Sequence, residues 1–381
     1  MRKSIRPPQT IGILGGGQLG RMLALKAREM GYQIVTLDPT PQSPCGQVAD
    51  KQIVSDYNSL SGAGQLAACS DVVTYEFENI SADLALELES HSYLPQGYQL
   101  LYTTQNRLRE KVAIQQAGIA VAPYRQVLNS QELLRAVEEL GLPVVLKTAE
   151  GGYDGKGQFV LKTSMQLDQA LAIVQDITQQ WVVEKFIPFA KELSVIVARN
   201  IAGEIEAFPV GENIHQQNIL HLTLVPARVD EILAKRAQEI AIQLAQKFSL
   251  VGLLAVELFL TQDGDLLVNE LAPRPHNSGH YTRQGCETCQ FEQHIRAICN
   301  LPLAKPKILH PTIMVNVLGK HLPEVTAAVS GWDSDWKLHV YGKAEGKPLR
   351  KMGHVNILTD NMDKTLVAIR KTGIWEMEGI E

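Results

Sequence analysis

The sequence has no long apolar run and no excess of positive charge. None of its segments approaches the roughly 18 consecutive apolar residues that a membrane-spanning helix requires. Its formal net charge is −5, whereas surfaces that bind nucleic acid are normally basic. We therefore expect neither a membrane nor a nucleic acid as a partner.

Cysteine is also sparse, with five residues in a chain of 381. A small, odd number favours a reducing compartment over a disulfide framework, and the first nine residues lack the apolar core of a signal peptide. Cys286 and Cys289 form a Cys-x-x-Cys pair, but the sequence offers no second pair or histidine cluster to complete a zinc site. We expect a cytoplasmic protein without structural zinc.

The pattern of predicted elements changes twice along the chain, and no internal repeat appears. Over residues 10–100, short β-rich runs alternate with helical patterns, which predicts an open parallel sheet. Residues 125–190 predict a small α+β unit around a glycine-rich loop, and longer strands follow. The class is therefore α/β and α+β. The predicted domains cover residues 1–105, 106–190 and 191–381.

A predicted hairpin near residue 260 brings two glutamates together. Asp263-Gly264 lies between two apolar runs, which is a strong hairpin signal. A two-residue turn there pairs Leu260 with Leu267 and, further out, Glu257 with Glu270. Facing carboxylates repel each other unless a cation lies between them, and carboxylates with phosphate oxygens are usual ligands of Mg²⁺. On these residues alone, a Mg²⁺ site and a one-residue slip of register are both open.

The first glycine-rich segment, Gly15-Gly-Gly-Gln18-Leu19-Gly20, follows a predicted strand and opens a predicted helix. Asp38 lies eighteen residues beyond it, so the segment fits the dinucleotide-binding fingerprint. Glycines permit close backbone approach, and a helix N-terminus offers N–H groups to a phosphate. The pattern does not identify the ligand, and a tight turn without any ligand is the plain alternative. An NAD-dependent oxidoreductase is therefore one candidate.

A second glycine-rich loop follows the apolar strand that ends at Lys147. Its sequence is Gly151-Gly-Tyr-Asp-Gly-Lys156-Gly-Gln158, which is not a Walker motif. Successive N–H groups of such a loop can converge on phosphate oxygens, and Lys147 and Lys156 add a cation at either end. A solvated hairpin loop is the alternative. The flanking lysines favour a phosphate lid, which a nicotinamide enzyme would not need.

Together these motifs resemble the ATP-grasp superfamily and, within it, the 5-(carboxyamino)imidazole ribonucleotide synthases of purine biosynthesis. The resemblance spans nearly the whole chain, in sequence order, through residues 12–22, 74–79, 151–158, 269–280, 341–343 and 350–354. Lys156 stands where Arg is also common and Cys289 where Ser is common, and both keep charge or size. The resemblance implies an ATP-grasp fold with an N-terminal Rossmann-like domain, a small lid domain and a larger C-terminal domain.

The resemblance also implies an ATP site between the lid and the C-terminal domain. The implied ATP-binding residues are Arg107, Lys147, Gly152, Tyr153, Asp154, Gly155, Lys156, Gly157, Gln158, Glu184, Lys185, Phe186, Ile187, Glu192, His215, Asn269 and Glu270. Residues 152–158 would close over the phosphates, 184–187 would meet the adenine through backbone groups, and Glu192 would take the ribose hydroxyls. Glu257 and Glu270 would hold Mg²⁺, the pair that the hairpin argument also selects.

A second implied site takes 5-aminoimidazole ribonucleotide. Its implied contacts are Gln18, Leu19, Glu76, Tyr153, Asp154, Arg274, His276, Asn277, Lys343 and Arg350. Lys343 and Arg350 would bind the ribotide phosphate, as a point charge and a two-donor group respectively. Asp154, Arg274 and His276 are the implied catalytic residues, with Asp154 orienting or deprotonating the amine. The first glycine loop would then serve the substrate and not NAD.

The implied reaction carboxylates this ribotide in a cytoplasmic homodimer. Bicarbonate attacks the γ-phosphate of ATP, and the resulting carboxyphosphate releases CO₂ beside the exocyclic amine, with positioning and electrostatics supplying most of the catalysis. Three alternatives are weighed against it. They are a formate-dependent glycinamide ribonucleotide transformylase of the same architecture, the NAD-dependent oxidoreductase, and a silent nucleotide-binding module that would not need both facing glutamates.

Overall fold

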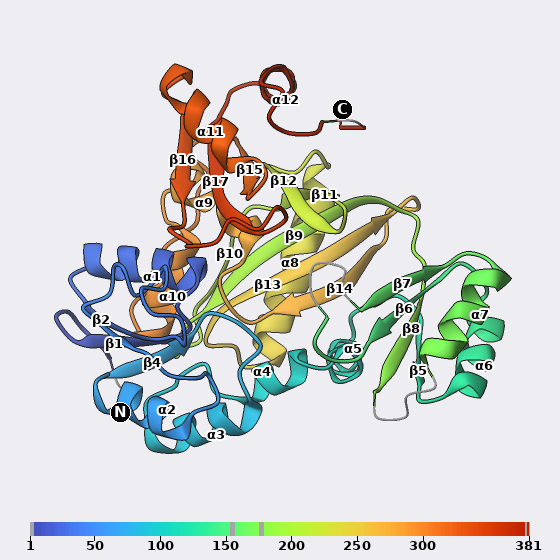
Figure 1. Ribbon diagram of the computed structural model, residues 1–381, viewed down its shortest axis with the longest axis horizontal. Coiled ribbons are helices and arrows are strands. Elements are labelled where there is room, and N and C mark those ends of the chain that lie inside the picture. The colour runs from blue at the N-terminus through green and yellow to red at the C-terminus, as the bar shows by residue number, and fades with distance from the viewer. Residues whose placement is uncertain (1–3, 153–156, 175–178, 378, 381) are drawn as a thin grey trace.

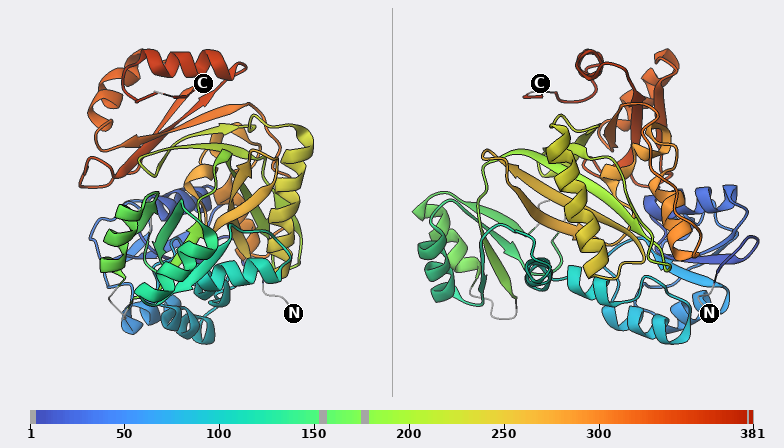
Figure 2. Two further views of the ribbon diagram at one scale, coloured as in Figure 1. Left: turned by 90° about the vertical axis from the view of Figure 1, so that its right-hand side faces the viewer. Right: turned by 180° about the vertical axis from the view of Figure 1, so that it is seen from behind.

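The computed structural model describes residues 4–152, 157–174, 179–377 and 379–380. In these parts of the chain, three sheets follow one another in sequence order (Figure 1). The large sheet lies in the middle, with the N-terminal sheet on one side and a second four-stranded sheet, the lid sheet (residues 124–185), standing out on the other (Figures 1 and 2). None of the helices in these ranges has the length and apolar character needed to span a bilayer.

The N-terminal sheet is parallel, as the sequence predicts, and runs in the order β3-β2-β1-β4. Its strands are β1 (Thr10–Leu14), β2 (Gln33–Leu37), β3 (Lys51–Ile53) and β4 (Val72–Tyr75). The helices of this region are α1 (Gln18–Glu29), α2 (Leu60–Ala68), α3 (Ala82–His91) and the unpredicted α4 (Gln99–Thr104). Most residues of β1, β2 and β4 are buried, since helices cover both faces of a parallel sheet.

The lid sheet is antiparallel and runs in the order β5-β8-β6-β7. Its strands are β5 (Tyr124–Val127), β6 (Val144–Thr148), β7 (Gln158–Leu161) and β8 (Trp181–Lys185). Helices α6 (Ser130–Leu140) and α7 (Ser164–Ile173) pack on one face, and α5 (Arg107–Gln116) precedes the sheet. The predicted lid residues Tyr153, Asp154, Gly155 and Lys156 lie outside the described residues.

The large sheet has nine strands in the described chain. They are β9 (Phe189–Arg199), β10 (Ile205–Ala207), β11 (Gly211–Gln216), β12 (Ile219–Val225), β13 (Gly252–Thr261), β14 (Leu266–Ala272), β15 (Thr312–Leu318), β16 (Trp336–Val340) and β17 (Lys351–Leu358). The helices of this region are α8 (Glu231–Lys247), α9 (Thr282–Gly285), α10 (Gln290–Ile298), α11 (Leu322–Ala328) and α12 (Met362–Lys371). β11, α9, α11 and α12 were not predicted.

Alternation along β9 explains how this sheet is covered. Leu193, Val195 and Val197 pack in the same core as α8, whereas Ile196 and Ala198 belong to a cluster on the opposite face. This two-residue period is expected of a strand between two apolar layers. On the N-terminal side, α10 packs against α1 as well as the large sheet, and so joins the two regions. The predicted boundary at residue 190 falls inside β9, and the domain division stays a prediction.

The hairpin between β13 and β14 confirms the predicted glutamate pair but reaches it by a different register. Leu260 pairs with Leu266 and not with Leu267, because the turn contains three residues, 262–264. A β-bulge between Glu257 and Leu258 then shifts the register by one, and Glu257 faces Glu270. The prediction of a two-residue turn was therefore wrong. The bulge restores the predicted pairing of Glu257 with Glu270 despite the longer turn. Bulges of this kind re-aim side chains beside functional sites.

The turn depends on Gly264, whose φ of +84° is in the left-handed region. Space is not the constraint, since a Cβ there would meet no atom within 4 Å. We predict that Gly264→Ala lowers the free energy of unfolding by about 1–2 kcal/mol through backbone strain alone. Gly331→Ala is the control, because Gly331 has the same free space without a positive φ. Chemical denaturation measures both, and equal effects would contradict the strain argument.

Candidate functional site

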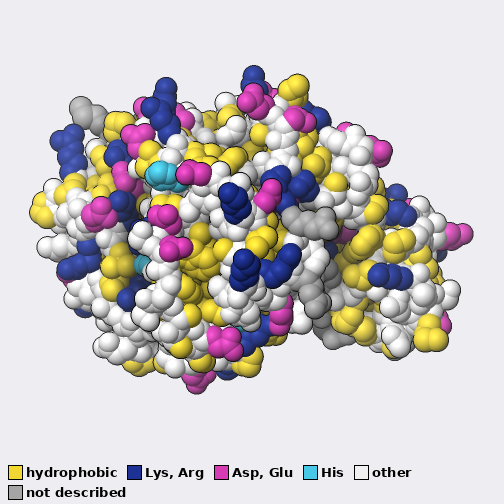
Figure 3. Space-filling model, turned by 90° about the horizontal axis from the view of Figure 1, so that it is seen from above, with side chains coloured by type: hydrophobic (Ala, Val, Ile, Leu, Met, Phe, Trp, Pro, Cys, Tyr) yellow, Lys and Arg dark blue, Asp and Glu magenta, His cyan; other side chains and the backbone are white. Residues whose placement is uncertain are grey.

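A cavity of about 710 Å³ is lined by all three regions of the chain. It collects most of the predicted site residues. Those that line it are Gln18, Leu19, Glu76, Arg107, Lys147, Gly152, Gln158, Glu184, Lys185, Phe186, Ile187, Glu192, His215, Glu257, Asn269, Glu270, Arg274, His276 and Asn277. On the face shown in Figure 3, basic and acidic side chains of the described residues are interspersed, without a continuous basic surface.

The first glycine loop binds the protein's own carboxylates. The N–H groups of Gly17 and Gly20 donate to Glu76, and Gly16 N donates to Asp38 Oδ2 at 2.9 Å. A Cβ on Gly17 would lie 2.7 Å from Glu76 Oε1, so glycine is needed for this approach. Burial raises the pKa of Glu76, and the two N–H donors oppose that rise. The amides that would bind a pyrophosphate are thus occupied, which removes the basis of the NAD interpretation.

Two cations from the lid side stand on the cavity wall. Lys147 Nζ lies 2.9 Å from Glu184 Oε2, and both side chains are buried. Arg107 donates from Nη1 to Glu270 Oε2 at 3.2 Å and from Nη2 to the carbonyl of Gly152 at 3.4 Å. Burial lowers the pKa of Lys147 and so do Arg107 and Lys111, while Glu184 counteracts them. Clustered cations of this kind suit a polyphosphate.

The hinge after β8 has fewer open backbone donors than predicted. Lys185 N donates to Pro123 O at 2.8 Å, and Phe186 N donates to Pro143 O at 3.2 Å. These two N–H groups are therefore committed to the lid's own structure. Past the hinge, the rings of Phe189 and Phe259 stack with centroids 4.7 Å apart, and both line the cavity.

Glu192 and His215 form a pair on the cavity wall beyond this aromatic stack. His215 Nδ1 is bonded to Glu192 Oε2. Burial would lower the pKa of His215, but the bond and the charge of Glu192 raise it above its ordinary value. The contact fixes the direction of the Glu192 carboxylate, which is the predicted ribose ligand.

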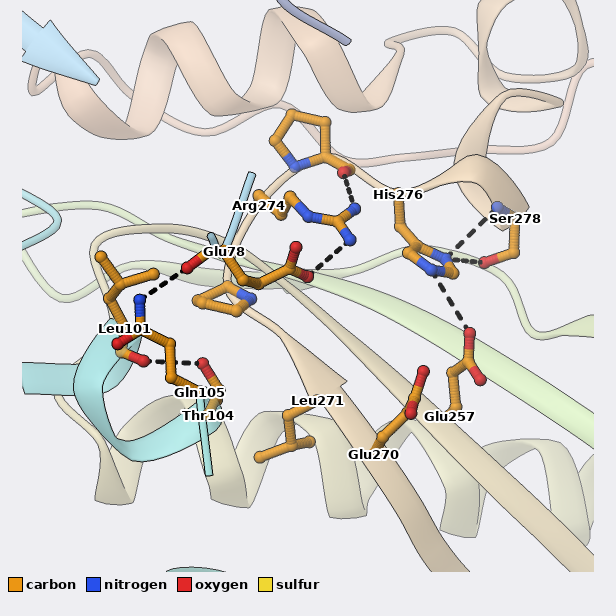
Figure 4. A network of polar contacts seen from close by, with 12 residues as sticks. Glu78, Leu101, Thr104, Gln105, Glu257, Glu270, Leu271, Arg274, His276 and Ser278 are labelled. Atoms are coloured by element: carbon orange, nitrogen blue, oxygen red, sulfur yellow. Dashed lines mark hydrogen bonds and ion pairs between the residues drawn. The ribbon is translucent and has the colours of Figure 1, made fainter. Parts of the chain in front are cut away.

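The opposed glutamates of β13 and β14 occupy opposite electrostatic surroundings (Figure 4). Burial and the charge of Glu270 raise the pKa of Glu257 to about 8. Burial would also raise the pKa of Glu270, but Arg107 and Lys147 bring it below its ordinary value. Without a cation between them, the pair therefore favours one proton on the Glu257 side.

The residues at this hairpin fit a divalent cation. Because of the bulge, consecutive residues Asn269 and Glu270 both line the cavity, and the buried Oδ1 of Asn269 has no hydrogen-bond partner among the described residues. No group of three or more Asp, Glu, His or Cys side chains in the described chain could enclose a metal. Two carboxylates open to a cavity match Mg²⁺ bound jointly by protein and phosphate oxygens.

His276 and Arg274 extend the polar wall toward the N-terminal region (Figure 4). The N–H of Ser278 donates to His276 Nδ1 at 3.3 Å, which assigns the ring proton to Nε2, 3.3 Å from Glu257 Oε1. Burial lowers the pKa of His276 well below its ordinary value, so the ring is neutral and orients Glu257. Arg274 pairs with Glu78 at 2.5 Å.

Asn277, beside His276, has no hydrogen-bond partner for either amide atom among the described residues. Both atoms are buried, and the residue lines the cavity. Buried polar atoms of this kind normally have a partner, so the Asn277 amide suits a polar ligand.

Three predicted residues lie away from the cavity wall. Gly157 instead closes the base of its loop, where its carbonyl accepts Thr148 N at 3.0 Å. Lys343 Nζ donates to Lys351 O at 2.7 Å, while the exposed Arg350 donates to Glu345 O at 3.1 Å.

The sequence interpretation missed Lys351, which does line the cavity. Its charge lowers the pKa of Glu257 and of His276. Lys351 belongs to the motif at 350–354, so the signal was present, but its neighbour Arg350 was selected instead. At the start of β17, only the fold shows which of two adjacent cations faces inward.

The two glutamates should respond differently to loss of charge in metal-free protein. Glu257→Gln relieves the repulsion, whereas Glu270→Gln removes the ion-pair partner of Arg107. We predict that Glu257→Gln raises the melting temperature at pH 8 by about 2 °C or more, and that Glu270→Gln does not.

The pH dependence gives a second check on this difference. The folded protein keeps a proton on Glu257 up to about pH 8, and the unfolded chain releases it near the ordinary value of 4.5. Wild-type stability therefore falls as pH rises between these values, and the advantage of Glu257→Gln should grow over that range. Calorimetry in EDTA at pH 5 and pH 8 measures it. An advantage that shrinks with rising pH would contradict the assignment.

Known proteins match this chain over nearly its whole length. Three family models match in order. The Ribonucleotide synthetase preATP-grasp domain matches residues 8–103, the ATP-grasp domain 112–291, and the Phosphoribosylaminoimidazole carboxylase C-terminal domain 312–367. An N5-carboxyaminoimidazole ribonucleotide synthase of Bacillus subtilis is 52% identical over 374 residues, which are 97% of this chain and 96% of the relative.

Solved structures of the same kind superpose closely. An N5-carboxyaminoimidazole ribonucleotide synthetase in complex with ADP has a TM-score of 0.96 at 55% identity, covering 98% of this chain and 99% of the other. An Aspergillus clavatus synthase in complex with ADP and 5-aminoimidazole ribonucleotide has a TM-score of 0.87 at 31% identity, covering 96% and 97%. The chain therefore belongs to the N5-carboxyaminoimidazole ribonucleotide synthase family and has the ATP-grasp fold.

Proposed function

We propose that this cavity carries out the ATP-dependent carboxylation of 5-aminoimidazole ribonucleotide with bicarbonate, in purine biosynthesis. The products are 5-carboxyaminoimidazole ribonucleotide, ADP and phosphate. One observation carries the proposal. The part of the cavity that suits a polyphosphate, which we call its phosphate-type half, is lined by Arg107, Lys147 and the glutamate pair, and the same cavity is lined by Glu76 from the N-terminal region. A reaction that joins a nucleotide to a second substrate needs both halves in one space.

The ATP half is proposed to lie between the lid sheet and the β13–β14 hairpin. Arg107 and Lys147 face the phosphates, and the described lid residues Gly152 and Gln158 border them. Glu192, oriented by His215, takes the ribose hydroxyls. The adenine lies at the hinge near Ile187, with Lys185 and Phe186 lining the pocket without donating their N–H groups.

Glu257 and Glu270 are proposed to hold Mg²⁺, with Asn269 Oδ1 beside them. The ion would neutralise charge on the phosphoryl group during its transfer. Its presence would also remove the repulsion between the two carboxylates. Arg107 would then be shared between Glu270 and the polyphosphate, which couples nucleotide binding to the hairpin.

The ribotide half is proposed to lie between the first glycine loop and the wall formed by Arg274, His276 and Asn277. Gln18, Leu19 and Glu76 line the N-terminal side of this half. Asn277 supplies an amide that can both donate and accept. The cations of the C-terminal region approach here, because the charge of Lys343 lowers the pKa of Glu76 and Lys351 lines the cavity.

The chemistry needs two bond-forming steps in a closed space. A bicarbonate oxygen attacks the γ-phosphorus while the bond to ADP breaks, and carboxyphosphate forms. Its C–O bond then breaks to give phosphate and CO₂, whose carbon is attacked by the exocyclic amine as that amine loses a proton. Asp154 stays our candidate for accepting the proton or orienting the amine. Arg274 stabilises negative charge and His276 positions Glu257, since a neutral ring suits orientation better than proton donation.

The proposal is tested by phosphate release from ATP and Mg²⁺ with bicarbonate and 5-aminoimidazole ribonucleotide added singly and together. Turnover should require both. Formate with glycinamide ribonucleotide should not replace them, and NADH or NADPH should not bind. A turnover that depends on formate would instead support the transformylase alternative. The homodimer and the cytoplasmic location stay predictions, and sedimentation velocity of the purified chain tests the first.

Glu270 should be indispensable for turnover. We predict that Glu270→Gln abolishes detectable ATP turnover with the fold retained, because a neutral amide is a poor Mg²⁺ ligand. Glu239→Gln on α8 is the matched control, since Glu239 is exposed and its contact with Lys235 at 3.9 Å is a surface pair. Coupled phosphate release at saturating ATP measures both variants. Wild-type turnover in Glu270→Gln would rule out the metal role of the hairpin pair.

The cations at the ribotide end should differ in importance. Lys351 lines the cavity and Lys343 is half-buried beside it, whereas Arg350 is exposed. We predict that Lys351→Met lowers kcat/KM for 5-aminoimidazole ribonucleotide about tenfold or more, as expected for a lost charged hydrogen bond. Among Lys351→Met, Lys343→Met and Arg350→Met, the last should have the smallest effect. The KM for ATP should change little in any of these three variants. The opposite ranking would restore Arg350 as the phosphate ligand.

A further inference from the structure

A fully buried lysine stands behind the phosphate-type half of the cavity. Lys111, on α5, is 1% exposed and is not among the described residues that line the cavity. Its ammonium lies 3.2 Å from Glu184 Oε1 and 5.7 Å from the ring centroid of Tyr124. A buried ammonium is costly unless it is paired. The carboxylate of Glu184 therefore explains why a lysine is tolerated at this position.

Glu184 is thereby shared between two lysines. Its Oε2 pairs with Lys147 at 2.9 Å, and its Oε1 pairs with Lys111. Lys147 and Glu184 line the cavity, while Lys111 lies behind them. The three groups together carry one net positive charge. Without Lys111, the pair of Glu184 and Lys147 would be neutral, and the cavity would lose attraction for an anion.

We propose that Lys111 is a positioning residue for nucleotide binding, which holds Glu184 from behind so that the charge of Lys147 stays available to phosphate. Lys111 itself touches no substrate. The inference rests on the proposed placement of the ATP phosphates at Lys147. It also gives the Glu184 side chain a role different from the backbone contact with adenine that the family resemblance implies.

The position of α5 supports this role, because the same helix serves both sides of the cavity. Arg107 pairs with Glu270 on β14, and Glu110 accepts the N–H of Leu271 at 2.8 Å. From the same helix, Lys111 pairs with Glu184 on β8 of the lid sheet. The helix that carries Lys111 is therefore also attached to the hairpin. This attachment holds the Lys111 charge in place relative to the proposed phosphate site.

The test compares ATP with adenosine, which has no phosphate. Lys111→Met should raise the KM for ATP about ten- to hundredfold. The inhibition constant of adenosine should stay within about threefold of the wild-type value. Adenosine is uncharged, so its binding does not depend on the net charge of this cluster. Lys111→Arg should restore most of the ATP affinity. Arg109→Met removes a cation from the same helix at a more exposed position and should have little effect.

A double-mutant cycle separates a positioning role from a structural one. In a Glu184→Gln background, Lys111→Met should change the KM for ATP by less than about threefold, because the carboxylate through which Lys111 acts is gone. If Lys111→Met alone does not fold, Lys111→Gln, which keeps a polar group beside Glu184, replaces it in both backgrounds. Equal effects in both backgrounds, or equal losses of ATP and adenosine binding, would overturn the inference.

Lys147→Met distinguishes failure of this inference from failure of the proposed ATP placement. An unchanged KM for ATP in Lys147→Met would refute the placement of the phosphates. A raised KM in Lys147→Met with an unchanged KM in Lys111→Met would refute only the role of Lys111.

Discussion

The opposition of Glu257 and Glu270 across one hairpin is the constraint on which the site depends. Two carboxylates at directly paired positions repel each other when no cation lies between them, and the pair distributes charge unevenly because Arg107 pairs with Glu270. The same arrangement becomes favourable when a cation and a polyphosphate enter. In the proposed function, this local repulsion would contribute to the affinity for metal and nucleotide.

The helix α5 connects this hairpin to the lid sheet. Arg107 and Glu110 contact β14, at Glu270 and at the backbone of Leu271, and Lys111 contacts Glu184 on β8. Burial and the neighbouring Glu270 raise the pKa of Glu110 to about 8. The helix is therefore part of the charge balance of the cavity, although its sequence shows no recognised motif.

The glycine loop at the N-terminus shows how one pattern can serve a different ligand. Its amides are arranged as a dinucleotide-binding loop would arrange them, but Glu76 and Asp38 accept their hydrogen bonds. A carboxylate at a helix N-terminus is stabilised by the same N–H groups and dipole that stabilise a phosphate. The loop consequently presents a fixed acid to the cavity.

The sequence by itself determined the class, the order of most elements and the ATP-grasp family, and most of the site residues inferred from it line the cavity. Local signals were sufficient for the elements, since period-two and helical patterns and glycine positions depend on near neighbours. Most of the site residues came from the family resemblance. Even the glutamate pair was predicted, although the predicted turn was one residue too short and the bulge at Glu257 was not foreseen.

Only the tertiary structure decided which adjacent cation faces inward, what occupies the first glycine loop, and what stands behind Glu184. Lys351, Glu76 and Lys111 take their partners from segments far away in sequence, so a motif can mark such a residue but cannot show what it contacts. The physical reason is that burial and charge at a site are properties of the assembled surroundings. A carboxylate or an ammonium acquires its pKa, its partner and its direction only when several distant segments meet.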